Sequence, residues 1–347
     1  MPKQDPKKLV FIRITALLVE VDSNMLPFVR KDESIIAELN KALYGCIESA
    51  VLWYEELSQT LLSLGMKKND TDPCIFNLSG KRHLTVTVYV DDLMILSDNV
   101  RTIDWLLTEL TTRYDELKIT RGMTHNYLGM VFDLSEPPFI IINQQGMIED
   151  IISSTKTSVK TATDTNSNIR SKVPPKTPAA PYLFDINTDA VLLPEQLQII
   201  FHSTVAKLIY ISTRTRQDLL TTISLLSKRV LHPTQEDWKK LQRALGYLEN
   251  TKTQNLKLGM IFPLTIRTYI DASFAVHSDY KSHTGICISL GVGIFYAKST
   301  AQKINTTSSC QAEMVALAKG LQQSIFSAYF LADQGYPMRQ IIVYQDN

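Results

Sequence analysis

The sequence predicts a multidomain protein of the α+β and α/β classes, for three reasons. The chain has 347 residues, which at roughly 150 residues per domain is enough for two or three domains. Hydrophobic residues make up 44% and charged residues 20% of it, a globular balance that excludes a wholly disordered, collagen-like or coiled-coil protein. Helical periodicity and strand-like alternation also follow one another on both sides of one polar segment.

Net charge, the length of apolar runs and the cysteines limit the partners and the location that we expect for the protein. A net charge of +1 creates no global field, so a nucleic acid must be met by local patches. No uncharged apolar run reaches the roughly 18 residues that span a bilayer, so we expect no membrane partner. The four cysteines are far apart and predict a reduced intracellular location, in the cytoplasm or nucleus, without a zinc site: Cys46, Cys74, Cys287 and Cys310.

Residues 1–152 form the first predicted segment, which mixes both kinds of element. Apolar spacing predicts helices over 48–64 and 100–114, and Gly65 ends the first of them. Between them, residues 83–97 read as two apolar strands on either side of two adjacent acids.

Those acids are Asp91 and Asp92, and the residues alone allow two interpretations of them. Adjacent carboxylates between apolar strands are costly unless a cation neutralises them, and hard oxygen ligands suit Mg²⁺. The alternative is an exposed turn, where aspartate is common.

A different composition marks residues 153–181, which are rich in Ser, Thr, Lys and Pro and contain no aromatic residue and no Leu. Such a segment buries too little apolar surface to offset its ordering entropy, so we expect a flexible linker. Residues 182–262 follow as a helical connection, with helical pattern over 194–250 and breaks near Arg214 and at His232.

The pattern along residues 263–347 predicts a mixed sheet with one helix. Strand patterns lie at 264–271, 284–290 and 294–298, then a helix opens at Ser308 and runs to 332, and a short apolar strand follows at 341–344. If the first and last strands are parallel neighbours, the acids that end them meet at one sheet edge.

Those two acids are Asp271 and Asp346. Glu313, early in the intervening helix, shares the face that packs on the sheet and is the third candidate for a metal site. An acid near a helix N-terminus is also common without any ligand. The six histidines show no two-histidine metal spacing, and we interpret them as structural or surface residues.

Several motifs resemble copia-type LTR retrotransposon Pol polyproteins. Residues 89–92 (YVDD) match the Tyr-x-Asp-Asp hairpin of reverse transcriptases, and residues 41–50 (KALYGCIESA) resemble the family's Lys-Ala-Leu-Tyr-Gly-Leu-Lys-Gln-Ser-Pro segment. Residues 127–130 (YLGM) are similar to its Phe-Leu-Gly segment in the primer-grip region. The motifs occur in family order and near family spacing.

The resemblance implies part of a right-hand polymerase palm with a thumb-like region. Asp91 and Asp92 would help to hold two Mg²⁺ ions, or Mn²⁺ in their place. Further binding residues carried over by the resemblance are those expected at the primer end, at the incoming deoxynucleoside triphosphate and in the primer grip: Tyr89, Val90, Gly45, Tyr127, Leu128 and Gly129. The interpretation of Trp53 and Tyr54 from the sequence is core packing on a helix.

The C-terminal segment resembles the ribonuclease H domain of the same polyproteins. Residues 269–273 (YIDAS), 281–285 (KSHTG), 307–313 (TSSCQAE) and 345–347 (QDN) follow its order, and 214–218 (RTRQD) resembles the connecting region. The resemblance implies that Asp271, Glu313 and Asp346 bind paired Mg²⁺ for cleavage of the RNA strand of an RNA–DNA hybrid.

The chain departs from the family pattern at both ends. The family's third palm acid has no match at Asp5 or Asp22, and its fourth ribonuclease H acid would lie beyond Asn347. We therefore expect a truncated portion of a transposition polyprotein, acting on RNA template, DNA primer and hybrid beside other Pol segments. The alternative is a catalytically inactive remnant that at most binds nucleic acid.

Overall fold

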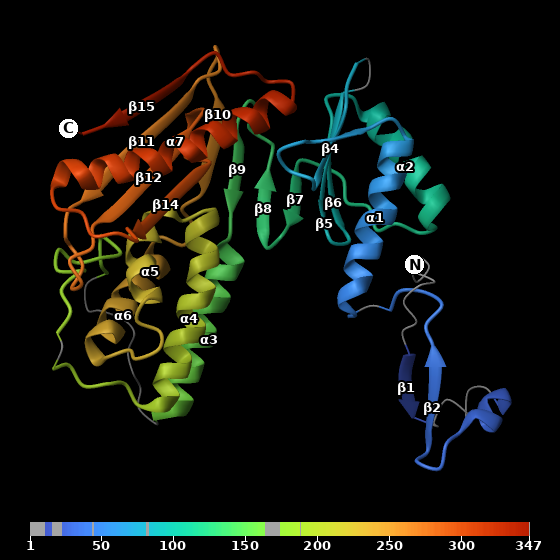
Figure 1. Ribbon diagram of the computed structural model, residues 1–347, viewed down its shortest axis with the longest axis horizontal. Helices are drawn as coiled ribbons and strands as arrows, with labels where there is room; N and C mark the ends of the chain where they lie inside the picture. The colour runs from blue at the N-terminus through green and yellow to red at the C-terminus, as the bar shows by residue number, and fades with distance from the viewer. Residues whose placement is uncertain are drawn as a thin grey trace. The chain divides into compact units, whose positions relative to one another are not determined.

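The computed structural model describes residues 11–15, 23–43, 45–80, 83–163, 174–187 and 189–346. The chain divides into two compact units, Met1–Leu117 and Lys118–Asn347, which are described separately here (Figure 1). Asp5, Asp22, Tyr44, the centre of the predicted linker and Asn347 lie outside the described residues.

The first unit is built on a four-stranded antiparallel sheet in the order β3-β4-β5-β6. Its strands are Lys67–Lys68, Ile75–Leu78, Leu84–Tyr89 and Asp92–Leu96. Two helices accompany it, α1 (Ile47–Ser63) and α2 (Val100–Tyr114), as the apolar spacing predicts. A separate two-stranded sheet pairs β1 (Phe11–Thr15) with β2 (Ser34–Glu38), and a 3₁₀ helix spans Ser23–Phe28.

Strand β5 packs one face against both helices. Its alternate residues are buried in one cluster with side chains of α1 and α2: Leu84, Val86, Val88, Leu57, Leu61, Leu106 and Leu110. Each such side chain contributes roughly 1.5–3 kcal/mol by leaving water. The strand that leads into the acidic turn is therefore firmly anchored.

The second unit contains a five-stranded antiparallel sheet in the order β13-β10-β9-β8-β7. Its strands are Gly291–Val292, Leu256–Met260, Ile140–Asn143, Met130–Asp133 and Thr124–Tyr127. Residues from three predicted segments thus join one sheet, because β10 pairs with β9 on one side and β13 on the other.

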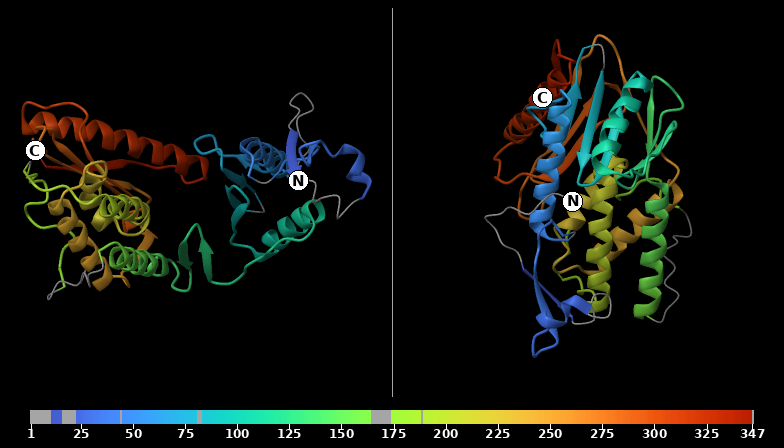
Figure 2. Two further views of the ribbon diagram at one scale, coloured as in Figure 1. Left: turned by 90° about the horizontal axis from the view of Figure 1, so that it is seen from below. Right: turned by 90° about the vertical axis from the view of Figure 1, so that its right-hand side faces the viewer.

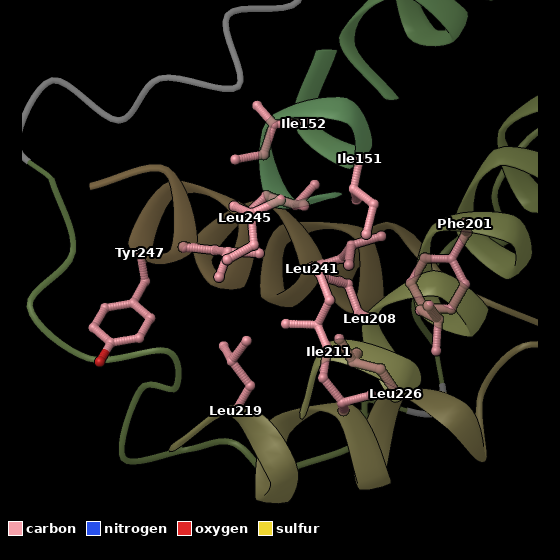
Figure 3. Packing of buried hydrophobic residues seen from close by; sticks show 14 of the residues in the cluster. Ile151, Ile152, Phe201, Leu208, Ile211, Leu219, Leu226, Leu241, Leu245 and Tyr247 are labelled. Atoms are coloured by element: carbon pink, nitrogen blue, oxygen red, sulfur yellow. The ribbon is translucent and has the colours of Figure 1, made fainter. Parts of the chain in front are cut away.

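Four helices of this unit pack around one apolar core. They are α3 (Gln145–Thr163), α4 (Glu195–Arg214), α5 (Leu220–Ser227) and α6 (Gln235–Asn250), with a 3₁₀ turn at Gln217–Leu219. Figure 3 shows the side chains that meet there, among them Phe201, Leu208 and Ile211 of α4. The predicted breaks near Arg214 and at His232 separate these helices.

The prediction of a linker over 153–181 is wrong for its first part, because α3 continues to Thr163. Ile151, Ile152 and Val159 are buried at helical spacing, and Thr155 donates to or accepts from Thr204 of α4 at 3.1 Å. Residues 174–181 contain no helix or strand.

The last part of the chain forms a four-stranded sheet in the order β14-β12-β11-β15. The strands are Tyr296–Ala301, His283–Ser289, Ile266–Ser273 and Ile341–Gln345. β11 and β15 are parallel neighbours, so the condition for Asp271 and Asp346 to meet at one sheet edge is fulfilled, and the other pairs are antiparallel. Helix α7 (Ser309–Asp333) lies along one face of this sheet (Figure 2).

Gly320 permits the close approach of α7 to β11. A Cβ atom at this position would meet Ile270 Cγ1 at 2.8 Å, and Cδ1 still closer. Ser324 and Thr268 complete the contact with a hydrogen bond of 2.6 Å between buried hydroxyls. None of the helices in the described part of the chain is long and apolar enough to cross a membrane.

Candidate nucleic-acid and metal sites

The YVDD motif forms a two-residue hairpin turn between β5 and β6. Tyr89 pairs with Asp92 across the hairpin, and Val90 and Asp91 make the turn. All four side chains are exposed, so the acids lie on a turn rather than among apolar residues. Among the described residues, no hydrogen bond or ion pair occupies either carboxylate.

Val90 has a φ of 55°, in the left-handed region. A β-branched residue is a clear outlier there, at a cost of order 1–3 kcal/mol. Backbone strain of this kind persists only where neighbouring structure holds it. At this turn the neighbour is Trp53 of α1, whose Nε1–H donates to the Val90 carbonyl oxygen at 2.7 Å.

Trp53 was interpreted from the sequence as a core side chain, and the structure adds this polar contact. Its ring does pack partly into the core cluster and lies 5.3 Å from the Tyr114 ring, centroid to centroid. The neighbouring Tyr54 donates its hydroxyl to the Pro73 carbonyl oxygen at 2.7 Å. Both residues follow Gly45, whose φ of 96° places it in the turn before α1, with open space where a side chain would begin.

A second hairpin turn carries the proposed primer-grip residues, in the second unit. Tyr127 and Met130 pair across it, while Leu128 and Gly129 have φ values of 51° and 69°. Positive φ at both central residues is typical of a type I′ turn. The hydroxyl of Tyr210 on α4 donates to the Leu128 carbonyl oxygen and fixes the turn against that helix.

The C-terminal sheet brings Asp271 and Asp346 together at one pocket of about 470 Å³. The register that pairs Ile270 with Gln345 places the two acids at the same level of neighbouring parallel strands. The pocket is also lined by residues of β11, β12, β14, β15 and the α4–α5 region, among them Tyr269, Tyr344, Lys298, Ser299 and Thr221. Hard oxygen donors therefore share an open, partly polar space.

Glu313 contacts the residues that adjoin this pair. Its side chain is buried, with Oε1 accepting from the Ala272 N–H at 2.9 Å and Oε2 accepting from Gln345 Nε2 at 2.8 Å. Glu313 does not line the pocket. The structure therefore brings Asp271 and Asp346 to the pocket and places Glu313 against the neighbouring residues Ala272 and Gln345.

Each candidate metal site therefore contains two carboxylates. Over the described ranges, no three histidine, cysteine, aspartate or glutamate side chains come together as a metal site. Mg²⁺ is nevertheless commonly bound by one or two carboxylates, with water and substrate phosphate oxygens completing the shell. Asp91 with Asp92, and Asp271 with Asp346, fit that ion in donor chemistry.

A buried histidine pair lies behind the pocket wall. His277 Nε2 and His283 Nδ1 are 3.0 Å apart, His283 Nε2 is 2.7 Å from Ser299 Oγ, and Phe184 packs against both rings. Burial, reinforced by nearby positive groups, lowers the pKa of His283 to about 4. Burial also lowers the pKa of His277. Both side chains are buried and held by hydrogen bonds and ring packing.

Comparison with known proteins finds a family match for the first part of the chain. Residues 26–167 match the family described as Reverse transcriptase (RNA-dependent DNA polymerase). This span includes the Gly45 turn, the YVDD hairpin and the Leu128–Gly129 turn. It therefore contains the three motifs that resemble reverse transcriptases, whereas the ribonuclease H-like motifs lie outside it.

Similar Pol polyproteins cover most of the chain. The retrovirus-related Pol polyproteins from transposon TNT 1-94 of Nicotiana tabacum and transposon RE1 of Arabidopsis thaliana are 24% and 28% identical over 90% and 92% of this chain. The chain spans only 23% and 21% of their lengths. The putative transposon Ty5-1 protein of Saccharomyces cerevisiae is 22% identical over 84% of the chain and 91% of its own length. The resemblance to copia-type retrotransposon Pol polyproteins is confirmed.

Proposed function

We propose that the chain is a portion of a retrotransposon Pol polyprotein that acts as an RNA-directed DNA polymerase. The observation that carries the proposal is the exposed YVDD hairpin, whose two carboxylates make no hydrogen bond or ion pair among the described residues, inside the segment that matches reverse transcriptases. Two acids with free oxygens on an anchored turn are suited to binding the metal–phosphate group of a nucleotide.

In this proposal, Asp91 and Asp92 would hold a divalent metal ion, Mg²⁺ or Mn²⁺. When bound, the ion would supply positive charge for activating the primer hydroxyl and stabilising the leaving pyrophosphate. The exposed Tyr89 and Val90 side chains contact the primer terminus, and the open space at Gly45 admits the incoming deoxynucleotide. In the second unit, Tyr127 and the Leu128–Gly129 turn form the primer-grip element.

A second activity, cleavage of the RNA strand of an RNA–DNA hybrid, is favoured by the pocket at Asp271 and Asp346. Parallel β11 and β15 present both acids at one edge, where α/β sheets commonly place ligands. Asp271 and Asp346 contribute metal ligands in this proposal, and Glu313 supports the end of β11 through the Ala272 amide. We assign 1–152 to the polymerase, 182–262 to the connection and 263–347 to the ribonuclease H-like part.

Template-directed nucleotide incorporation tests the polymerase proposal. The full chain should extend a DNA primer on an RNA template in Mg²⁺ or Mn²⁺, and Asp91→Asn should reduce the rate by about 100-fold or more. Asp98→Asn, which changes an exposed acid on the loop after β6, is the matched control and should retain wild-type activity. Equal rates for the wild type and Asp91→Asn would contradict the assignment.

Hybrid cleavage tests the second activity. A labelled RNA–DNA hybrid should be cut by the wild type and not by Asp271→Asn, while a DNA duplex of the same sequence remains intact because it lacks 2′-hydroxyls. Glu236→Gln, which removes only an exposed ion pair with Lys239, is the control. Undiminished cleavage by Asp271→Asn would refute the role of this pocket.

An inactive remnant remains the competing function, favoured by the lack of a three-acid group in the described ranges. The two alternatives differ in their response to metal. Ligands that bind only the folded state raise its stability, so an intact site predicts a melting temperature that rises with Mg²⁺. A melting temperature that stays constant up to tens of millimolar Mg²⁺, in chain that also fails to extend a primer, would favour the remnant.

A further inference from the structure

The turn that carries Asp91 has a conformation that its own sequence disfavours. Two-residue hairpin turns with positive φ at the first position favour glycine or asparagine there, and this chain has valine. Antiparallel pairing holds the turn from the Tyr89 and Asp92 ends. That pairing fixes only the residues that flank the turn. We therefore expect a further contact to keep Val90 in the left-handed region, because an extended Val90 would redirect Asp91.

Trp53 makes that contact. Its indole N–H reaches the Val90 carbonyl oxygen at 2.7 Å, across 37 residues of sequence. The indole ring is itself held by α1 and by the tilted Tyr114 ring of α2. The hydrogen bond therefore connects the anchored core of the unit to the strained peptide between Val90 and Asp91.

We propose that Trp53 is a positioning residue for the acidic turn: its indole N–H holds the Val90 peptide so that Asp91 and Asp92 are presented together to metal and nucleotide. The expected effect on catalysis rests on the proposed polymerase function. The effect of Trp53 on the conformation of the turn does not, and it can be tested without measuring activity.

Core packing is the competing role for Trp53, and phenylalanine separates the two. Trp53→Phe keeps an aromatic ring beside Tyr114 but removes the donor to Val90. Tyr54→Phe is the matched control, because it removes a hydrogen bond of equal length from the same helix to a different carbonyl, that of Pro73. Val90→Gly removes the conformational cost of positive φ, so the turn should then need Trp53 less.

Hydrogen–deuterium exchange of the full chain measures the structural part. In Trp53→Phe, amides of the peptide covering 89–93 should exchange about fivefold faster, the effect of losing one net hydrogen bond. Amides of α2 should keep their wild-type rates. Tyr54→Phe should leave 89–93 unchanged, and Trp53→Phe should have no effect on these amides when added to Val90→Gly.

Nucleotide incorporation measures the catalytic part. Trp53→Phe should raise the Mg²⁺ concentration for half-maximal incorporation severalfold and lower kcat, with an unchanged KM for primer–template, because only the acids are displaced. If wild-type chain incorporates no nucleotide, the proposed function fails while the exchange result still decides the role of Trp53. Unchanged exchange at 89–93, or an equal increase in α2, would overturn the inference.

Discussion

Acid pH should destabilise the second unit through His283, and replacing this residue should remove the effect. The pKa of His283 is lowered to about 4 in the folded chain, mainly by burial, against 6.5 as the ordinary value. The unfolded chain therefore binds a proton as pH falls through 6.5, while the folded chain does not until pH approaches 4. The stability contributed by neutral His283 is complete above pH 6.5 and is lost between pH 6.5 and 4.

The magnitude follows from the difference in proton binding. At 1.36 kcal/mol per pKa unit, the full separation amounts to about 3 kcal/mol, and about 2 kcal/mol of it should be lost between pH 7 and pH 4.5. His277 adds to the effect in the same direction, because its pKa is lowered too. The loss loosens the β12–β14 wall of the pocket, where His283 contacts Ser299.

Urea denaturation at pH 7 and pH 4.5 checks this prediction. His283→Gln keeps hydrogen-bonding groups but cannot titrate, so its free energy of unfolding should fall by about 2 kcal/mol less between the two pH values than that of the wild type. His232→Gln, at an exposed histidine, should behave as the wild type does. An identical pH response in His283→Gln and the wild type would refute the reasoning.

Three further substitutions test the packing that positions the sites. Gly320→Ala should lower the free energy of unfolding by about 1–3 kcal/mol in urea denaturation, because the new methyl group overlaps Ile270; an unchanged value would show that Ile270 adapts. Tyr210→Phe should speed amide exchange in the β7–β8 hairpin severalfold while α4 keeps its rates, since only the hydroxyl bond to Leu128 is lost; equal protection in both proteins would disprove the clamp. Arg216→Met should destabilise by about 1–3 kcal/mol in the same denaturation assay, because the buried guanidinium loses its bonds to the exposed Asp218 and to the Thr251 carbonyl oxygen. An unchanged free energy of unfolding would contradict this.

Local sequence pattern was sufficient for most elements. The period of 3.6 residues located α2 at Val100–Tyr114, and the apolar runs around Asp91 located both strands of the hairpin. The strand–helix–strand order of the C-terminal part led to the parallel pair β11 and β15, because a crossover helix permits this pairing. These features depend on residues near one another in sequence.

Features that depend on distant partners could not be predicted in this way. The bond from Trp53 to Val90 requires α1 to lie beside a turn 37 residues later, and neither residue signals it. The hydrogen bonds of Glu313 with the Ala272 amide and the Gln345 side chain likewise join residues far apart in the sequence. The predicted start of the linker falls inside α3, because its composition outweighs the helical spacing of Ile151, Ile152 and Val159.

The paired acids of the two proposed sites are expected to bind divalent metal. Mn²⁺ titration followed by electron paramagnetic resonance, with primer–template and an incoming nucleotide present, tests this claim most directly. Asp91→Asn with Asp92→Asn should abolish one class of bound Mn²⁺, and Asp271→Asn with Asp346→Asn should abolish another. Identical Mn²⁺ binding by both double variants and the wild type would contradict the claim.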